Sequence, residues 1–187
     1  MATYQFSALS DGQAISFNPD TDVLNFDQTT IAAADVGAAT EGANLRISVG
    51  DKDVLLTNVS LPQIAVTNLT FADGSDFLVG DNTTGTSNDD LANSLTGTAG
   101  RDHLEGLGGN DTLNGGAGND VYVVNPGDVI QDSGGIDTIF ASASFALPSA
   151  IENITYLGTA NTQSSGNSFA NVMIGNSGMN YLDGRDG

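Results

Sequence analysis

The 187-residue chain contains no cysteine and only four basic residues. The lack of cysteine excludes disulfides and the thiolate ligands that are typical of zinc and iron–sulfur sites. Four basic against 23 acidic residues give a formal net charge of −19. Nucleic acid and anionic membrane surfaces are bound through lysine and arginine, so neither is expected as a partner. A bound cation, in contrast, would relieve repulsion among the carboxylates.

Glutamate and long apolar runs are also scarce. Three acidic residues are glutamate (Glu41, Glu105 and Glu152) and 20 are aspartate. Aspartate is typical of turns and oxygen-rich loops, so this bias predicts a turn-rich β protein with sites for hard cations. No apolar run approaches the roughly 20 residues of a membrane span. The first residues lack the basic and apolar regions of a secretory signal.

Candidate catalytic residues are few. The chain has one histidine, His103, and neither a Gly-x-Ser-x-Gly nor a His-Glu-x-x-His motif. Nothing in the pattern brings two glutamates together as a glycosidase pair. We expect His103 to be a solvent-facing strand residue rather than a general base beside Asp102. The chain is therefore predicted not to be an enzyme, and any catalytic domain of a parent protein is expected outside it.

What the chain does contain is three consecutive nine-residue units, at 97–105, 106–114 and 115–123. Each unit has glycine at its first and fourth positions, aspartate at the sixth, and a large apolar or aromatic residue at the eighth. The eighth positions are Leu104, Leu113 and Tyr122. A flexible linker has no reason to keep these side chains in phase with the aspartates.

This pattern resembles the calcium-binding nonapeptide of the RTX (repeats-in-toxin, haemolysin-type) family. The resemblance implies a right-handed parallel β-roll, or β-solenoid, that binds Ca²⁺. In each unit a glycine-rich turn precedes a short strand whose central side chain enters the core. Two units form one coil, so Asp102 and Asp120 are expected on one edge and Asp111 on the other. Members of the family leave bacteria by type I secretion and fold outside, which implies a secreted or cell-surface location.

The family's ligand positions can be carried over residue by residue. They fall on Gly97, Ala99, Asp102, Gly106, Gly108, Asp111, Gly115, Ala117 and Asp120. Asp111 needs a partner on its own edge, and the candidates are Asp89 before it and Asp128 after it. One coil has a thin core, whereas ordering its turns costs roughly 1–2 kcal/mol per residue. We therefore expect folding of about residues 85–125 to depend on calcium.

Four regions are expected along the chain. They are a β-rich N-terminal domain (1–80), a linker with a degraded repeat (81–96), the calcium-binding repeats (97–125) and a degenerate, truncated β-roll continuation (126–187). The first region resembles the β-rich domain that accompanies RTX repeats in bacterial secreted proteins, through features such as the turn at 70–74. Its segment 50–53 predicts a hairpin, and 31–36 fits a short helix or a loop.

The regions on either side of the intact units carry weaker repeats. Before them, Gly85, Asp89 and Leu91 fit the second, sixth and eighth positions of a unit. After them, asparagine replaces aspartate at Asn171 and Asn180, which keeps an acceptor oxygen and removes the charge. We expect these later rungs to be held by amide hydrogen bonds, with little or no calcium. The chain stops inside a further unit and is expected to be part of a longer protein.

Three functions fit these observations. The leading one is a secreted calcium-binding structural module. The alternatives are a self-assembling surface or adhesion subunit, which would associate through open solenoid ends, and the non-catalytic part of a larger secreted enzyme. A carbohydrate-binding module ranks last, because only exposed Asp and Asn residues favour it.

Overall fold

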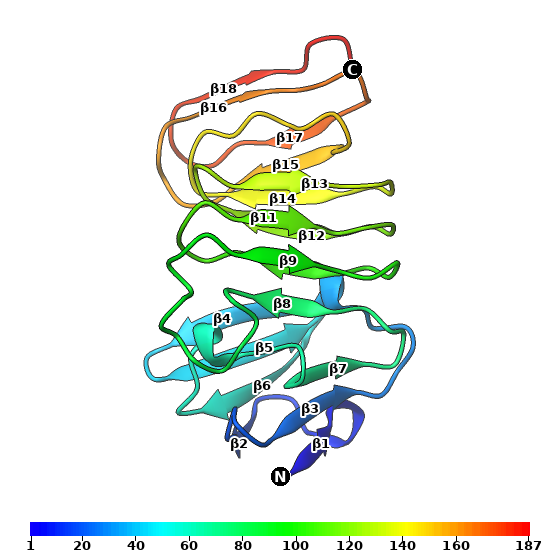
Figure 1. Ribbon diagram of the computed structural model, residues 1–187, viewed down its shortest axis with the longest axis vertical. Helices are drawn as coiled ribbons and strands as arrows, with labels where there is room; N and C mark the ends of the chain where they lie inside the picture. Colours follow the sequence, from blue (N-terminus) through cyan, green and yellow to red (C-terminus); the bar gives the residue numbers. More distant parts are fainter.

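A computed structural model describes all 187 residues as an elongated stack of short strands, with the two chain ends at opposite ends of the stack (Figure 1). The helices are the three single 3₁₀ turns η1 (Phe6–Ala8), η2 (Ala33–Asp35) and η3 (Leu61–Gln63). None of them has the length or apolar character needed to cross a bilayer. The prediction of an all-β fold is confirmed.

The main wall of the stack is a six-stranded sheet in which every pair of neighbours is parallel. Its strands are β8 (Phe77–Val79), β10 (His103–Glu105), β12 (Val121–Val124), β14 (Thr138–Ala141), β15 (Asn153–Tyr156) and β17 (Val172–Ile174). The register aligns Leu104 with Tyr122 and Tyr122 with Ile139. Each nonapeptide thus adds one rung directly above an earlier one.

The opposite wall contains two smaller parallel sheets. One has β9 (Ser94–Thr96), β11 (Thr112–Asn114) and β13 (Val129–Gln131), and the other has β16 (Thr162–Ser165) and β18 (Asn180–Asp183). Between the two walls lies a core that includes Leu95, Leu104, Leu113, Tyr122 and Ile139. This arrangement confirms the predicted parallel β-solenoid.

The N-terminal part is built largely from parallel strands as well. The strands β1 (Thr3–Gln5), β3 (Val23–Phe26) and β7 (Leu69–Phe71) form one parallel sheet. A four-stranded sheet contains β2 (Gln13–Ser16), β6 (Lys52–Thr57), β5 (Asn44–Val49) and β4 (Gly37–Glu41). The predicted hairpin is confirmed, since β5 and β6 are antiparallel. Within 31–36, only the short turn η2 is helical.

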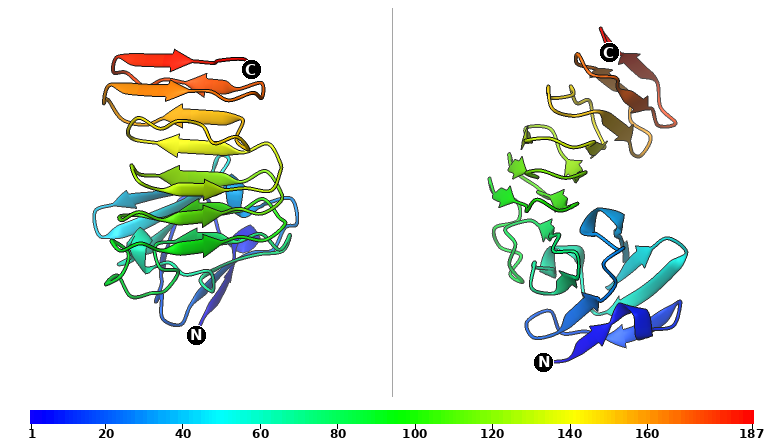
Figure 2. Two further views of the ribbon diagram at one scale, coloured as in Figure 1. Left: turned by 45° about the horizontal axis from the view of Figure 1, so that its top comes forward. Right: turned by 90° about the vertical axis from the view of Figure 1, so that its right-hand side faces the viewer.

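The strand β8 connects the N-terminal core to the solenoid core. Phe77 and Val79 point into the N-terminal cluster, whereas Leu78 between them packs in the solenoid cluster. This division follows from the alternation of side chains along a strand. The stack is continuous across this strand, with the N-terminal sheets beside and below the first coils (Figure 2). The domain boundary expected at residue 80 stays a prediction.

The exposure expected for His103 is wrong. Its ring stacks on Phe77 with the centroids 4.2 Å apart, and the residue is only 7% exposed. Phe77 comes from β8, the neighbouring strand in the sheet. The outward face of the solenoid is therefore covered at this rung by the N-terminal part of the chain.

The register expected for the degraded repeat is also wrong. Leu91 is 57% exposed, and the side chain that enters the core is Leu95 of β9. A unit counted back from Gly97 begins at Asn88 and places Asn93 at the sixth position and Leu95 at the eighth. The repeat register therefore extends one unit further toward the N terminus, with asparagine in place of aspartate.

Candidate metal centre

Aspartates at the ends of the turns form a ladder along each edge of the solenoid. On the first edge, which leads into the six-stranded sheet, the backbone N–H of Asp102 donates to Asp120 Oδ1 over 2.9 Å. The N–H of Asp120 donates in turn to Asp137 Oδ1 over 2.8 Å, and that of Asp137 donates to Glu152 Oε2 over 2.9 Å. Each carboxylate therefore accepts a hydrogen bond from the coil below it. The predicted placement of Asp102 and Asp120 on one edge agrees with this geometry.

The second edge repeats the arrangement with fewer members. Asn93 donates its N–H to Asp111 Oδ1 over 2.8 Å, and Asp111 donates its N–H to Asp128 Oδ1 over 2.9 Å. Asp128 is thus the ladder neighbour of Asp111 on one side, whereas Asn93 takes the position on the other side that was expected for Asp89. The carboxylate of Asp89 instead accepts the N–H of Asp81 within its own long turn.

The second oxygen divides these carboxylates, Asp89 included, into two groups. Asp102 Oδ2 accepts the N–H of Thr98 over 2.6 Å, and Asp128 Oδ2 accepts the N–H of Asn125 over 2.7 Å. In the other group the Oδ2 atom is buried and has no hydrogen-bond partner. This group contains Asp89, Asp111, Asp120 and Asp137. A buried carboxylate oxygen without a donor is costly unless a cation occupies the space beside it.

The pKa of all four unpartnered carboxylates is raised. Burial raises the pKa of Asp120 to about 6 and that of Asp137 to about 7. It raises the pKa of Asp89 and Asp111 as well. Burial disfavours the charged form of an acid when no positive charge compensates it. A cation beside these four carboxylates would therefore favour their charged form.

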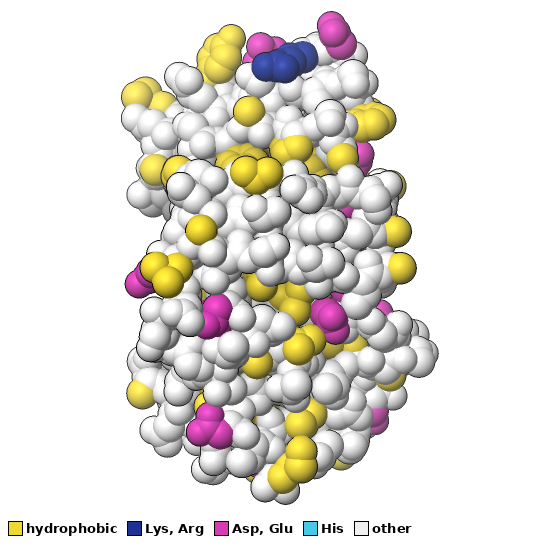
Figure 3. Space-filling view, in the orientation of Figure 1, with side chains coloured by type: hydrophobic (Ala, Val, Ile, Leu, Met, Phe, Trp, Pro, Cys, Tyr) yellow, Lys and Arg dark blue, Asp and Glu magenta, His cyan; other side chains and the backbone are white.

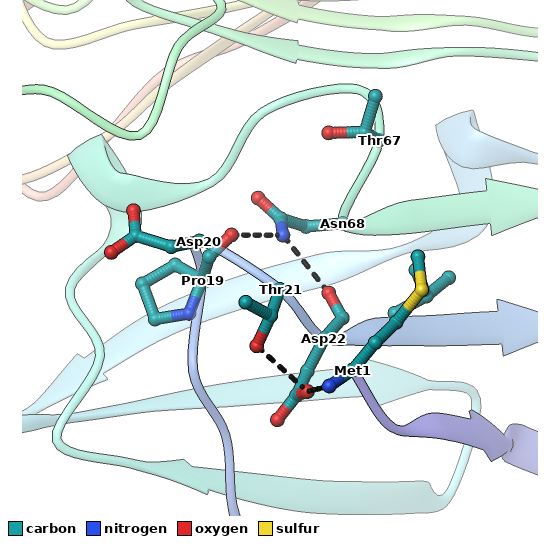
Figure 4. A pocket seen from close by; sticks show the side chains of 8 residues that line it. Met1, Pro19, Asp20, Thr21, Asp22, Thr67 and Asn68 are labelled. Atoms are coloured by element: carbon teal, nitrogen blue, oxygen red, sulfur yellow. Dashed lines mark hydrogen bonds and ion pairs between the residues drawn. The ribbon is translucent and has the colours of Figure 1, made fainter.

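Asp22 in the N-terminal part provides a contrast at an equivalent position. It precedes β3, and its Oδ1 accepts the N–H of Ala2 over 2.7 Å, as in the ladder. Its Oδ2 accepts the N–H of Asn18, so both oxygens have donors. Figure 4 shows two further groups beside this carboxylate, the hydroxyl of Thr21 and the amino group of Met1. These backbone hydrogen bonds lower its pKa. An aspartate that directly precedes a strand therefore has donors on both oxygens here, whereas the unpartnered oxygens lie in the solenoid.

Glycines create the space beside the carboxylates. A Cβ atom at Gly106 would collide with the carboxylate of Asp111, and one at Gly115 would collide with that of Asp120. At Gly97 the nearest atom would be Asp102 Oδ2, at 2.5 Å. The first glycine of each unit therefore lets the backbone approach the carboxylate of its own turn. This proximity is what the assigned roles of Gly97, Gly106 and Gly115 require.

The other assigned backbone positions lie in the same turns. Gly108 donates its N–H to the carbonyl of Asp89, and Ala117 forms an isolated bridge with Gly134 of the next coil. Ala99 lies exposed in the turn before β10. Carboxylate and carbonyl oxygens are the ligands that Ca²⁺ prefers, so the donor set fits this cation. The ligand roles themselves stay predictions.

Two acidic residues of the first edge were missed as site residues by the sequence analysis. Asp132 and Asp137 each place one oxygen within 4.8 Å of an oxygen of Asp120, and of each other. Their unit, 132–140, has glycine at its fourth position, aspartate at its sixth and Ile139 at its eighth. A fixed nine-residue period counted from Gly97 does not align with this unit, because the unit before it is one residue short.

The asparagine rungs are held as expected. Asn171 Nδ2 donates to the carbonyls of Ile151 and Glu152, over 3.2 Å each. Asn180 Nδ2 donates to the carbonyl of Gly178 over 2.6 Å, and its Oδ1 accepts from Thr162 Oγ1. An amide satisfies both its donor and its acceptor groups in this position, so no charge needs compensation. The prediction of amide hydrogen bonds is confirmed.

The aspartates of the ladder are buried. Asp102, Asp111, Asp120 and Asp137 are each at most 1% exposed. On the face shown in Figure 3, acidic side chains appear as separate spots rather than as one patch. The strongly acidic composition therefore includes a set of carboxylates buried along the edges of the stack.

Comparison with known proteins identifies the repeats. A family model, the RTX calcium-binding nonapeptide repeat, matches in four copies, within residues 84–122 and 165–187. No curated protein and no solved structure matches the chain.

Proposed function

We propose that this chain, whose RTX calcium-binding nonapeptide repeats form a parallel β-solenoid, is a secreted structural module whose β-roll folds on binding calcium. One observation carries the proposal. Four aspartates (Asp89, Asp111, Asp120 and Asp137) each have a buried oxygen without a hydrogen-bond partner. A hard divalent cation is the ligand that such oxygens attract most strongly.

Calcium would stabilise the solenoid at its stacked carboxylates. Neighbouring strands lie about 4.8 Å apart, so stacked carboxylates repel each other across a buried gap. A cation that binds only the folded state stabilises it by about 2.7 kcal/mol at 100 times its dissociation constant. Several such sites would make folding of the repeats depend on calcium, as in other metal-coupled folds.

The proposed location follows from the same dependence. In a compartment with little calcium the repeats would stay unfolded, and they would fold where calcium is abundant. This behaviour suits export of an unfolded chain, and the RTX resemblance favours type I secretion from a bacterium. The net charge of −19 supports the proposal, because it disfavours the compact state until cations are bound.

Circular dichroism and calorimetry test the proposal on the whole chain. In calcium-depleted buffer the β signal of the repeats should be reduced, and calcium should restore it with a measurable heat of binding. Magnesium at equal ionic strength is the control, because it demands a small octahedral site and dehydrates reluctantly. An unchanged β signal in the absence of calcium, together with no heat on its addition, would contradict the proposal.

We also propose that the chain is not itself an enzyme. The environment of the single histidine supports this. Neither ring nitrogen of His103 has a hydrogen-bond partner, and the ring is stacked on Phe77. A general base needs a partner that orients it and access to substrate.

A second candidate function is self-association through the exposed apolar side chains of the C-terminal strands. The last coil exposes several large apolar side chains, including Met179 at 75% and Tyr181 at 65%. The strands β17 and β18 each have a neighbour on one side only. Light scattering with and without calcium tests this function. Growth of the particles with calcium would support an assembly subunit, whereas a constant monomer mass would contradict it.

A further inference from the structure

The turn before β14 differs from the intact repeats at its first position. There Asp132 replaces the first glycine of a unit that otherwise keeps Gly135, Asp137 and Ile139 in register. The side chain of Asp132 is partly buried and is held at both oxygens. Tyr122 Oη donates to Asp132 Oδ1 over 2.8 Å, and the N–H of Gly134 donates to Asp132 Oδ2 over 2.7 Å.

This substitution brings a third carboxylate to a place that already has two. Asp120, Asp132 and Asp137 each contribute an oxygen, and the three oxygens lie within 4.8 Å of one another. Independently of this cluster, Asp120 Oδ2 and Asp137 Oδ2 are buried and have no donor. Both residues are at most 1% exposed, so water does not compensate these atoms from outside.

Tyr122 positions the carboxylate of Asp132. It occupies the eighth position of its unit, where the two preceding units have leucine. Besides donating to Asp132, the hydroxyl accepts the N–H of Gly115 over 3.0 Å. A Cβ atom at Gly115 would collide with both this hydroxyl and Asp120 Oδ2. The tyrosine thus reaches from the core to the edge of the stack and orients Asp132 beside the unpartnered oxygens.

We propose that Asp132 is a third carboxylate ligand, positioned by Tyr122, of a calcium ion held by Asp120 and Asp137, and that this is the tightest cation site of the chain. The proposal rests on the proposed calcium-binding function. Elsewhere, Asp89 and Asp111 each have one buried oxygen without a partner, but no other three carboxylates come within 4.8 Å of one another. Calcium affinity rises with the number of charged ligands.

Calcium titration calorimetry of the whole chain and its variants tests the proposal. Asp132→Asn removes the charge and keeps the shape, and Asp132→Gly restores the residue that the repeat normally has. Both should weaken the tightest binding step by about tenfold or more. Asp51→Asn, in the exposed turn between β5 and β6, changes the net charge equally and should leave that step unchanged.

Terbium luminescence gives a second readout, because a nearby tyrosine sensitises emission from a bound lanthanide. The first terbium equivalent should emit strongly in the wild type and only weakly in Tyr122→Phe. Circular dichroism at saturating calcium verifies that each variant is folded. If Asp132→Asn does not fold, Asp132→Gly alone is used for the calorimetric test.

The outcomes separate the two proposals. An unchanged tightest step in both Asp132 variants, or an effect on a weaker step only, would overturn the role of Asp132 while leaving calcium binding intact. Absence of calcium binding by the wild type would instead overturn the proposed function.

Discussion

The backbone N–H of Asp102 donates to Asp120 Oδ1 over 2.9 Å, across two stacked coils. Asp120 therefore has two separate tasks, because one oxygen satisfies a buried backbone donor and the other has no protein partner. The first task is structural and needs only an acceptor. The second task depends on the negative charge, because it is the interaction with a cation. Variants of Asp120 can separate the two tasks.

Replacement of Asp120 should give different losses for asparagine and alanine. Asp120→Asn keeps an acceptor for the N–H of Asp102 and loses only the charge. Asp120→Ala also leaves that buried N–H unpaired, which costs about 1–3 kcal/mol more. Urea unfolding in saturating calcium should therefore rank the wild type above asparagine and asparagine above alanine. Equal losses in the two variants would show that the ladder hydrogen bond contributes nothing.

Substitution of Gly115 should be far more damaging than substitution of Gly85. A Cβ atom at Gly115 collides with the Tyr122 hydroxyl and the Asp120 carboxylate, whereas at Gly85 the nearest atom would be 3.7 Å away. We expect Gly115→Ala to lower the free energy of unfolding by about 1–3 kcal/mol, as overpacked sites do. Gly85→Ala should change it little. Thermal unfolding in calcium compares the two, and similar midpoints would contradict the crowding seen at Gly115.

The response to pH should change sign with calcium. Burial raises the pKa of Asp137 from 3.8 to about 7, so the metal-free folded state keeps a proton that the unfolded chain loses between these values. For this group, lowering the pH from about 7 to about 4 therefore stabilises the metal-free fold. In the presence of calcium, the same fall in pH destabilises the fold, because protons compete with the cation for the carboxylate oxygens.

Thermal unfolding of the wild type and Asp137→Asn measures this effect. The difference between the two proteins isolates Asp137 from other titrating groups. In calcium-depleted buffer the wild type should gain stability relative to the variant as the pH falls, and in calcium it should lose its advantage. Parallel shifts of both proteins under both conditions would argue against the raised pKa.

His103 should tolerate an apolar ring. Its two nitrogens are buried without hydrogen-bond partners, with Glu105 Oε2 3.8 Å from Nε2, and the ring stacks on Phe77. His103→Phe keeps the stacking and removes the unsatisfied polar atoms, so it should leave stability unchanged or raise it. Phe77→Ala, in contrast, should cost about 3–5 kcal/mol because it empties the space under the ring. Chemical unfolding of both variants checks this, and a large loss in His103→Phe would reveal a polar role for the imidazole.

The repeat pattern predicted the solenoid and the stacking of Asp102 on Asp120, because a fixed period of two units translates directly into spatial register. It failed where the period changes. The eight-residue unit at 124–131 moves Asp132 and Asp137 out of step with the earlier units, although the structure stacks them without a gap. The long turn at 80–93 likewise concealed that Leu95, not Leu91, enters the core.

The environment of His103 was beyond reach of the repeat pattern for a different reason. Its neighbour Phe77 precedes the repeats, and the outward side of β10 faces the N-terminal part of the chain. One surface cavity is lined by His103, Val121 and Val123 together with residues 34–38, which shows that the two parts of the chain lie close together here. Local alternation assigns such a side chain to solvent, and only the tertiary arrangement places it in contact with another core.

The ladder hydrogen bonds all run the same way along the stack. On both edges, each coil offers its N–H to the carboxylate of the coil that follows it in sequence. The solenoid is therefore polar, with a donor end that faces the C terminus and an acceptor end that faces the N terminus. Loss of a ladder carboxylate therefore leaves an unpaired ladder N–H in the preceding coil and none in the coil that follows.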